Sequence, residues 1–295
     1  MHEHENEDKK GKRLFFSIFF NLSIVLAEII GGLVSRSTAL LSDAAHNSAD
    51  VLSMIFSYSA VRVSKRKRDE KFTYGYERAE VIAAVVNSVF LMVVGGFVTF
   101  EGVKKLISPE AIDPKVMLPV AIIGLAGNIL TILFLHEHHH DINVHSTLVH
   151  ITADAISSVL VVALGIVLFF KPLYFLDGLI SLAIAVYMIY MGWKVFKRAS
   201  SILMQVKPEW IDLNDLKRSI ESLKGVKDVH HIHVWTMNGE NAFAELHVTL
   251  QNRSVDADSI RETIKGKLKE LGVSHSTVQI EYRNCEEISK EASQV

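Results

Sequence analysis

The chain has 295 residues, of which 49% are hydrophobic, and its mean hydropathy of +0.25 is high for a soluble protein. It carries 31 Lys and Arg against 33 Asp and Glu, a formal net charge of −2, so nothing in its charge points to nucleic acid as a partner. The single cysteine, Cys285, excludes an intrachain disulfide and a CxxC zinc site.

Most of the apolar residues lie in long runs between residues 14 and 203, whereas residues 204–295 have the composition of a charged globular segment. A helix needs about 20 apolar residues to cross a hydrocarbon core. Six segments qualify, at roughly 14–34, 38–62, 79–104, 116–136, 144–170 and 174–197. The sequence therefore predicts a membrane all-α domain of six transmembrane helices over residues 13–203, preceded by a cytoplasmic tail of residues 1–12.

Lys and Arg are distributed unequally between the segments that join these spans. One side of the membrane receives residues 9–13, 62–71 and 194–198, which are rich in both, and the other receives only Arg36, Lys104, Lys105, Lys115 and Lys171. Positive residues accumulate on the cytoplasmic side. We therefore expect both termini, and the histidine-rich segment 136–140, on the cytoplasmic side of the cell (inner) membrane.

The remaining chain is predicted to form a cytoplasmic α+β domain over residues 207–284, followed by a tail at 285–295. IDLNDLKRSIESL and SVDADSIRETIKGKLKEL have the pattern of amphipathic helices. VKDVHHIHVWTM, AFAELHVTL and STVQIEYR alternate as strands do, and Asn238-Gly239 marks a turn between the first two. The order α-β-β-α-β predicts a sheet with one face covered by the two helices.

Two matched pairs of ionisable residues lie inside the second and fifth spans. His46 and Asp50 are four residues apart, as are His150 and Asp154, so each pair occupies one face of its helix. An uncompensated Asp near the bilayer centre costs about 2.5–3.5 kcal/mol, which a bound cation would offset. Two imidazoles and two carboxylates suit zinc, whereas magnesium and calcium prefer all-oxygen sites. A single such pair could instead stabilise helix packing or relay protons.

These pairs also suggest how a metal ion would be released. A protonated histidine is not a ligand, so proton binding competes directly with metal binding. We therefore predict that metal export is driven by proton entry. Asp43 lies one turn before His46 and is a candidate residue for access to the site or for support of its ligands.

Several motifs resemble the cation diffusion facilitator family, and the match covers nearly the whole chain. They are SxALLSDAxHNxxD at residues 37–50, FTYGYERAEVIAAVVN at 72–87 with Tyr74 in place of the usual Phe, HxxxD at 150–154, and VHHIHVWTMNG, HVTL and STVQIE in the last part. The resemblance implies a homodimeric metal/proton antiporter that works by alternating access and exports zinc, and also cadmium or cobalt. It further implies a ferredoxin-like, metallochaperone-like cytoplasmic domain, no organic cofactor and no enzymatic activity.

The resemblance also implies a second metal site in the cytoplasmic domain, where zinc would be a regulatory ion that steadies the dimer. By position in the family, its ligands would be His230, His247, His275 and Glu281. Strand alternation would put His231 and His233 on the face opposite His230. The alternative is a set of solvent-facing histidines on an open sheet.

Two other functions compete with transport. HEHHH at residues 136–140 matches the HExxH signature of zinc proteases, in which His136 and His140 would bind zinc and Glu137 would be the base. In a histidine-rich run at a membrane edge, a loop that gathers metal is the simpler interpretation. A membrane sensor that binds metal without moving it is the other rival. Asp69 matches a position of a further metal site in some family members, but its loop contains no histidine, so we expect no site there.

Overall fold

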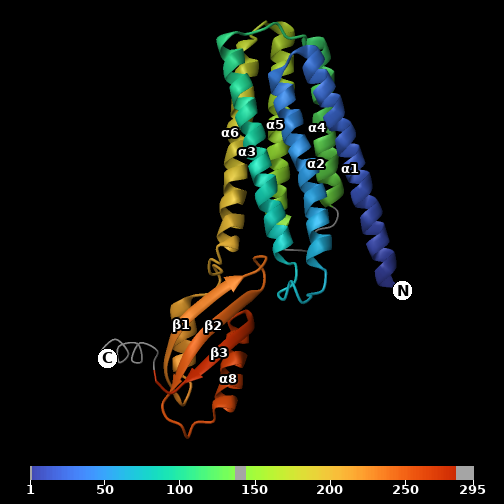
Figure 1. Ribbon diagram of the computed structural model, residues 1–295. Helices are drawn as coiled ribbons and strands as arrows, with labels where there is room; N and C mark the ends of the chain where they lie inside the picture. The colour runs from blue at the N-terminus through green and yellow to red at the C-terminus, as the bar shows by residue number, and fades with distance from the viewer. Residues whose placement is uncertain (1, 137–143, 284–295) are drawn as a thin grey trace. The chain divides into compact units, whose positions relative to one another are not determined.

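The computed structural model describes the backbone of residues 2–136 and 144–283 and the side chains of residues 19–130 and 155–283. The chain divides into two units (Figure 1). The first unit comprises residues 1–62 and 83–196, and the second comprises residues 63–82 and 197–295.

The first unit is built from long helices that run up and down beside one another (Figure 1). They are α1 (His2–Ser35), α2 (Thr38–Ser64), α3 (Arg78–Ile107), α4 (Pro114–His136), α5 (Val144–Phe170) and α6 (Phe175–Leu203). These helices coincide with the six predicted spans, although α1 begins at His2 and α6 continues to Leu203. Helices satisfy their own backbone hydrogen bonds, as a chain within lipid requires.

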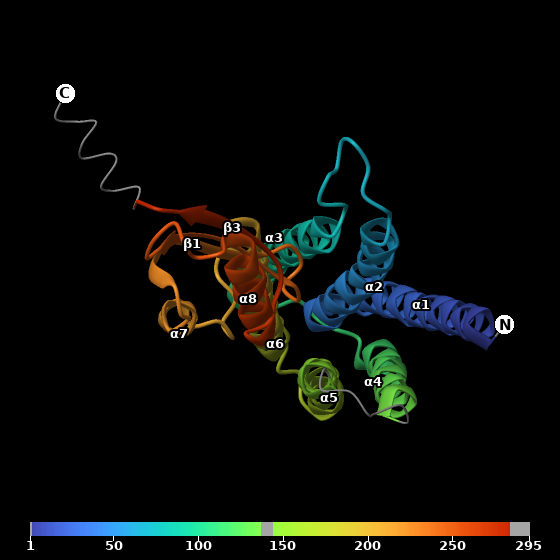
Figure 2. The ribbon, with the colours of Figure 1, turned by 90° about the horizontal axis from the view of Figure 1, so that it is seen from below.

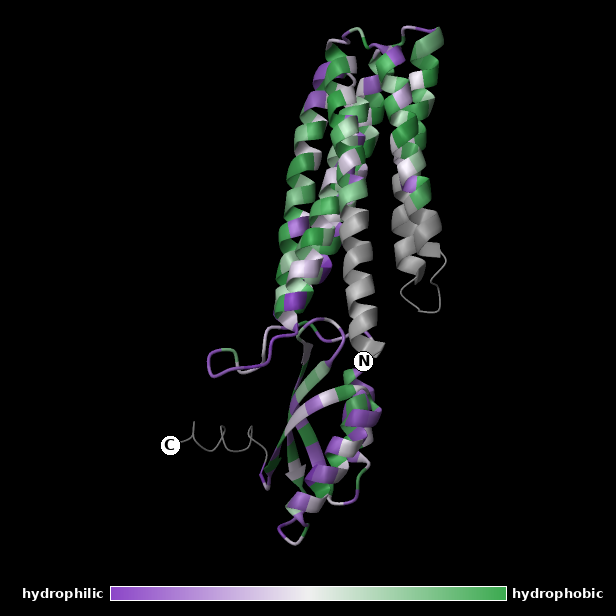
Figure 3. Ribbon diagram, turned by 90° about the vertical axis from the view of Figure 1, so that its right-hand side faces the viewer, coloured by the Kyte–Doolittle hydropathy of each residue, from purple (hydrophilic) through white to green (hydrophobic). Residues whose placement is uncertain are grey.

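Most described residues of these helices are hydrophobic, as the predominantly green ribbon of Figure 3 shows, and many of their apolar side chains are exposed. On α3, Val93, Phe97 and Phe100 are each at least 66% exposed, and they recur at helical spacing. Within the described side chains, α3 and α6 are long and apolar enough to cross a membrane, and Phe19–Ser35, Pro114–Leu130 and Ala155–Phe170 are shorter apolar stretches. An apolar surface of this kind is expected for helices in contact with the hydrocarbon core of a membrane.

The helices pack closely where small residues meet. A Cβ on Gly192 of α6 would lie 2.7 Å from Cγ of Met92 and 3.0 Å from the carbonyl oxygen of Ser88, both on α3. A larger residue at position 192 would therefore push α3 and α6 apart, as is typical of small residues between membrane helices. A second contact region is an apolar core between α2, α4, α5 and α6, which includes Leu40, Met117, Val161, Leu164 and Met188.

The second unit confirms the predicted order α-β-β-α-β. It contains α7 (Leu213–Glu221), β1 (Val226–Thr236), β2 (Ala242–Leu250), α8 (Ala257–Glu270) and β3 (Val273–Glu281). The sheet has the order β1-β2-β3, with β1 antiparallel and β3 parallel to β2. Gly239, at a φ of 92°, lies in the loop between β1 and β2. Asp212 and Asp256 are the N-caps of α7 and α8, and each accepts hydrogen bonds from two backbone N–H groups.

Both helices of the second unit cover the same face of its sheet (Figure 2). Alternate residues of the strands, including Val229, Leu246 and Val248, point into the core that they form with Ile220 of α7 and Ile264 of α8. The other face of the sheet is not covered by α7 or α8. His230, His247 and Glu281 lie on this open face.

Candidate metal centres

The first predicted pair lies within α2, where the helix turns its polar residues inward. His46 is 1% exposed, and its Nε2 atom is 3.9 Å from Oδ2 of Asp50, as the four-residue spacing predicts. The His46 ring meets Tyr187 of α6 edge-on, with 5.9 Å between ring centroids. The pair therefore places a buried imidazole beside a carboxylate that is 31% exposed.

The neighbouring residue Asn47 links this part of α2 to α1. Its Nδ2 atom donates a hydrogen bond of 2.9 Å to Oε2 of Glu28, which is itself 1% exposed. Gly124 of α4 makes room for this carboxyl group, because a Cβ at Gly124 would lie 2.0 Å from Oε1 of Glu28. The contact holds α1 and α2 together beside His46.

The second predicted pair, His150 and Asp154, lies on the backbone of α5, but its side chains are outside the described residues. One turn further along α5 the side chains are described. Ser157 and Ser158 donate hydrogen bonds of 2.7 Å and 2.9 Å to the two oxygens of Asp43 on α2. A contact between α2 and α5 therefore lies one turn from each predicted pair.

Asp177 has a role that its sequence position did not reveal. It lies in the first turn of α6, yet its carboxylate accepts hydrogen bonds from the N-terminus of α2, at 2.6 Å from Ser37 Oγ, 2.8 Å from Thr38 N and 3.1 Å from Ala39 N. A carboxylate at a helix N-terminus is favoured by the helix dipole and by the otherwise unpaired N–H groups. Asp177 therefore anchors the start of the helix that carries His46 and Asp50.

Replacing Asp177 by alanine should lower the thermal stability of the purified protein. The change leaves two N–H groups and one buried hydroxyl without their acceptor, so we expect a loss of roughly 2 kcal/mol or more in the free energy of unfolding. The control is Asp113→Ala, because the exposed carboxylate of Asp113 accepts only from Lys115 N among its described contacts. Equal melting temperatures for the two variants in detergent would show that Asp177 does not anchor α2.

Three side chains on the open face of the second unit could share one ion. His230 of β1, His247 of β2 and Glu281 of β3 each place a ligand atom within 4.8 Å of the others. His230 Nε2 is 3.3 Å from Glu281 Oε2, and His247 Nδ1 is 2.9 Å from Glu281 Oε1. Their side chains are only 10–16% exposed. Three of the four predicted cytoplasmic ligands therefore come together.

The fourth predicted ligand, His275, does not join this cluster. It lies near the start of β3, opposite Phe243, and its ring is 5.7 Å from the Phe243 ring. Six residues of strand separate it from Glu281, a distance of roughly 20 Å at about 3.3 Å per residue. A single ion cannot contact both residues.

The expected alternation along β1 is also wrong. The register shifts between His230 and His233, and His231 has a φ of 48°, so β1 contains a bulge at this point. After the bulge, His233 pairs with Glu245 on the open face instead of pointing to the opposite face. The His231 ring lies 4.9 Å from the His247 ring and 5.4 Å from the His230 ring. The bulge thus adds histidines to the face that carries the cluster.

A neighbouring carboxylate favours Nε2 as the nitrogen of His230 that binds a cation. Asp228 Oδ2 is 2.9 Å from His230 Nδ1. If Nδ1–H donates to Asp228, then Nε2 has a lone pair that faces a Glu281 oxygen. A cation bound between Nε2 of His230 and Oε2 of Glu281 would be coordinated by both atoms. A carboxylate that orients a ligating histidine in this way is typical of zinc sites, so the donor set fits zinc with one coordination position left for another ligand.

The loop between α2 and α3 uses Asp69 for a different purpose. The Asp69 carboxylate accepts hydrogen bonds from the Tyr76 hydroxyl at 2.7 Å and from the backbone N–H groups of Phe72 and Lys71 at 2.7 Å and 2.9 Å. The Tyr76 hydrogen bond, and then the backbone bonds, lower the pKa of Asp69. Both carboxylate oxygens of Asp69 therefore hold the loop in shape. This use agrees with the expectation that the loop, which contains no histidine, does not bind a metal ion.

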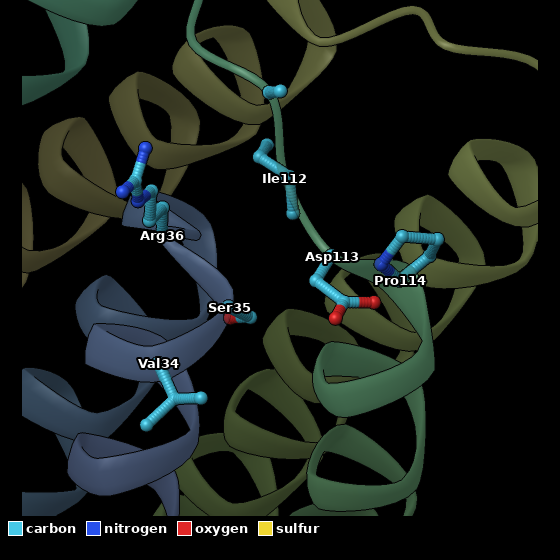
Figure 4. Close-up of a pocket in the computed structure, with 7 residues that line it drawn as sticks. Val34, Ser35, Arg36, Ile112, Asp113 and Pro114 are labelled. Atoms are coloured by element: carbon cyan, nitrogen blue, oxygen red, sulfur yellow. The ribbon is translucent and has the colours of Figure 1, made fainter.

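A cavity of about 340 Å³ opens where the α1–α2 connection meets the start of α4 (Figure 4). Its only carboxylate, among the lining residues, is Asp113, which accepts a hydrogen bond from Lys115 N, and Asp113 N donates to Ser35 O at 3.0 Å. The cavity offers no second metal-binding side chain beside Asp113. The cavity therefore lacks the neighbouring metal-binding side chains that the two clusters described above contain.

Comparisons with known proteins match both parts of the chain. A family model for the cation efflux transmembrane domain matches residues 14–204, and a model for the cytoplasmic domain of cation efflux proteins matches residues 208–283. The chain belongs to the cation diffusion facilitator family. The resemblance seen in its motifs is thereby confirmed, and the chain is a membrane transporter of the metal efflux class and not an enzyme. The protease motif His136-Glu137-His140 lies outside the described side chains.

Named relatives of this cation diffusion facilitator span nearly its full length. The zinc transporter ZitB of Yersinia pestis is 31% identical over 95% of this chain and 90% of its own. The cadmium, cobalt and zinc/H(+)-K(+) antiporter of Bacillus subtilis is 29% identical over 95% of this chain and 91% of its own. The metal cation efflux system protein CzcD of Cupriavidus metallidurans is 27% identical over 97% and 91%, respectively.

Proposed function

We propose that this protein exports zinc across the cell membrane in exchange for protons, with the ion held by His46, Asp50, His150 and Asp154. The observation that carries the proposal is the pairing on α2 of a buried His46 with a partly exposed Asp50, next to a direct contact between α2 and α5. Cadmium and cobalt would be further substrates, because nitrogen and oxygen ligands discriminate poorly among these ions.

The hydrogen bond between Ser157 and Asp43 supports a single metal site formed by both His–Asp pairs, one on α2 and one on α5. Helices α2 and α5 run in opposite directions in the bundle (Figure 1). Continuing the antiparallel register from Asp43 and Ser157 brings position 46 level with position 154, and position 50 level with position 150. Each histidine would then lie level with the aspartate of the other helix. This arrangement would supply four protein ligands to one ion, the number that zinc prefers.

Proton coupling follows from the chemistry of histidine. An imidazole binds either a proton or a metal ion through the same nitrogen lone pair, so a proton that arrives from outside displaces the ion. The printed name of the Bacillus subtilis relative includes both protons and potassium as counter-ions. Protons are favoured here because both proposed ligand pairs contain a histidine.

An imposed pH gradient should therefore drive zinc across the membrane of proteoliposomes that contain the purified protein. We expect zinc to move against the direction of proton flow, and to slow when a proton carrier collapses the gradient. A matched potassium gradient at constant pH is the control. Zinc flux that follows the potassium gradient and ignores the pH gradient would contradict proton exchange.

The direction of net flux rests on the charge distribution. The Lys- and Arg-rich segments 62–71 and 194–198 adjoin the ends of α2, α3 and α6, and they favour a cytoplasmic position for both termini. Protons that enter the cell would then expel zinc. The membrane-sensor alternative predicts zinc binding without flux, so the same proteoliposomes separate the two functions.

The cytoplasmic cluster fits a regulatory zinc ion. We assign His230, His247 and Glu281 as its ligands and exclude His275 because of its distance along β3. Zinc prefers four ligands, so water or His231 would fill the fourth coordination position of the ion. A homodimer is expected, with this domain as part of its interface, because the matching family model for residues 208–283 is named for dimerisation.

A further inference from the structure

The contact between α2 and α5 can do more than hold two helices together. We propose that Asp43, Ser157 and Ser158 form a latch that closes the path between the transport site and the outer surface, and that must open for the ion to leave. The inference rests on the proposed transport by α2 and α5. In the proposed orientation, the latch lies one turn from the ligand pairs on the side away from the cytoplasm.

The latch is a buried polar network that joins three helices. Ser157 and Ser158 each donate to one oxygen of Asp43, and Ser158 also accepts a hydrogen bond of 2.8 Å from Asn128 Nδ2 on α4. Asp43 and Ser158 are each 1% exposed, and Ser157 is 6% exposed. The carboxylate is therefore closed off from water by hydroxyl groups in this structure.

An apolar layer continues the closure toward the outer end of the helices. It contains Leu40 of α2, and Val161 and Leu164 of α5, all of them at most 2% exposed. A hydrated metal ion cannot pass such packed side chains. The ion can leave only if α2 and α5 separate here, and that separation breaks the bonds between Asp43 and the two serines.

Serine hydroxyls make a closure of this kind reversible. A serine that loses its partner in another helix can rotate and donate to a carbonyl oxygen of its own helix, four residues earlier. Opening therefore leaves no serine hydrogen unpaired. The same movement uncovers the Asp43 carboxylate, which would attract the departing cation. The latch thus closes the path when its hydrogen bonds are formed, and it offers a carboxylate to the departing cation when they are broken.

A cysteine pair tests whether these residues must separate during transport. The native Cys285 is replaced by serine, and Asp43→Cys and Ser157→Cys are introduced together. A metal-free thiol oxidant should stop zinc flux, and a reductant should restore it. The controls are the two single-cysteine variants, which should be insensitive to the oxidant. If the cross-linked protein carries zinc as fast as the reduced protein, the latch does not open during transport and the proposal is wrong.

A second experiment does not depend on zinc transport or on activity of the cysteine pair. Ala44 is fully buried beside Asp43, so Ala44→Cys reports access from outside to a membrane-impermeant thiol reagent. Combining it with Ser157→Ala and Ser158→Ala should speed labelling at least about tenfold, because hydrogen bonds to a charged group shift a two-state equilibrium by that order. The matched control is Ser42→Ala, whose buried hydroxyl donates within its own helix to Thr38 O. Equal labelling rates would overturn the latch even if zinc transport were never observed.

Discussion

Replacing Asp50 by alanine should abolish zinc flux in proteoliposomes. Asp50 lies beside His46 on α2 and supplies one of the carboxylates proposed to hold the ion. Loss of a supporting residue around a metal ligand already costs roughly 10–100-fold in affinity or activity, so loss of a ligand should reach at least the upper end of that range. The measurement is the initial rate of zinc flux under a fixed pH gradient.

Two further variants are needed to interpret the result for Asp50→Ala. Asp50→Asn keeps the size of the side chain but removes its charge, and it should be nearly as defective as Asp50→Ala. Ser53→Ala, on the same helix and bonded to Asn87 Nδ2 at 3.1 Å, should transport zinc at close to the wild-type rate. Substantial flux by Asp50→Ala, with normal insertion and amount of protein, would remove Asp50 from the transport site.

The largest effect expected in the cytoplasmic domain is loss of one zinc ion per chain when His230, His247 and Glu281 are all replaced by alanine. The side chains lie on the face of the sheet that α7 and α8 leave uncovered, so the core of the domain should survive the change. Zinc binding to the full-length protein, measured by equilibrium dialysis, should fall by one ion. Because protons compete for the same imidazoles, binding at this site should weaken as pH falls.

His275→Ala is the matched control for the cytoplasmic cluster. It removes a histidine from the same sheet, but from the other end of β3, beside Phe243. The zinc content of this variant should equal that of the wild type. Loss of an ion in His275→Ala, or unchanged zinc content in the triple variant, would show that the cluster is not the metal site.

The sequence was sufficient for the architecture because periodicity and hydropathy are local properties. Six apolar runs gave six helices, and alternation with turn residues gave the α-β-β-α-β order. The pairing of His46 with Asp50 was equally local, since it depends only on helix geometry. The cluster of His230, His247 and Glu281 came from family position, and three of its four proposed members are adjacent in space.

The failures involve features that local patterns do not encode. Simple alternation misplaced His233 because a bulge at His231, where φ is 48°, adds one residue to β1. Asp177 lies in the first turn of α6, but the partners of its carboxylate are Ser37, Thr38 and Ala39, about 140 positions away. The serines that bind Asp43 carry no distinctive motif. Only the packing of α2 against α5 brings them to Asp43.

The central claim is that one zinc ion is held in the membrane domain by two imidazoles and two carboxylates. X-ray absorption at the zinc edge tests it most directly, with one equivalent of zinc bound to the triple alanine variant of His230, His247 and Glu281. We predict a four-coordinate shell of nitrogen and oxygen at about 2.0–2.2 Å, with the outer-shell scattering of two imidazoles. A six-coordinate oxygen shell without imidazole scattering would contradict the account.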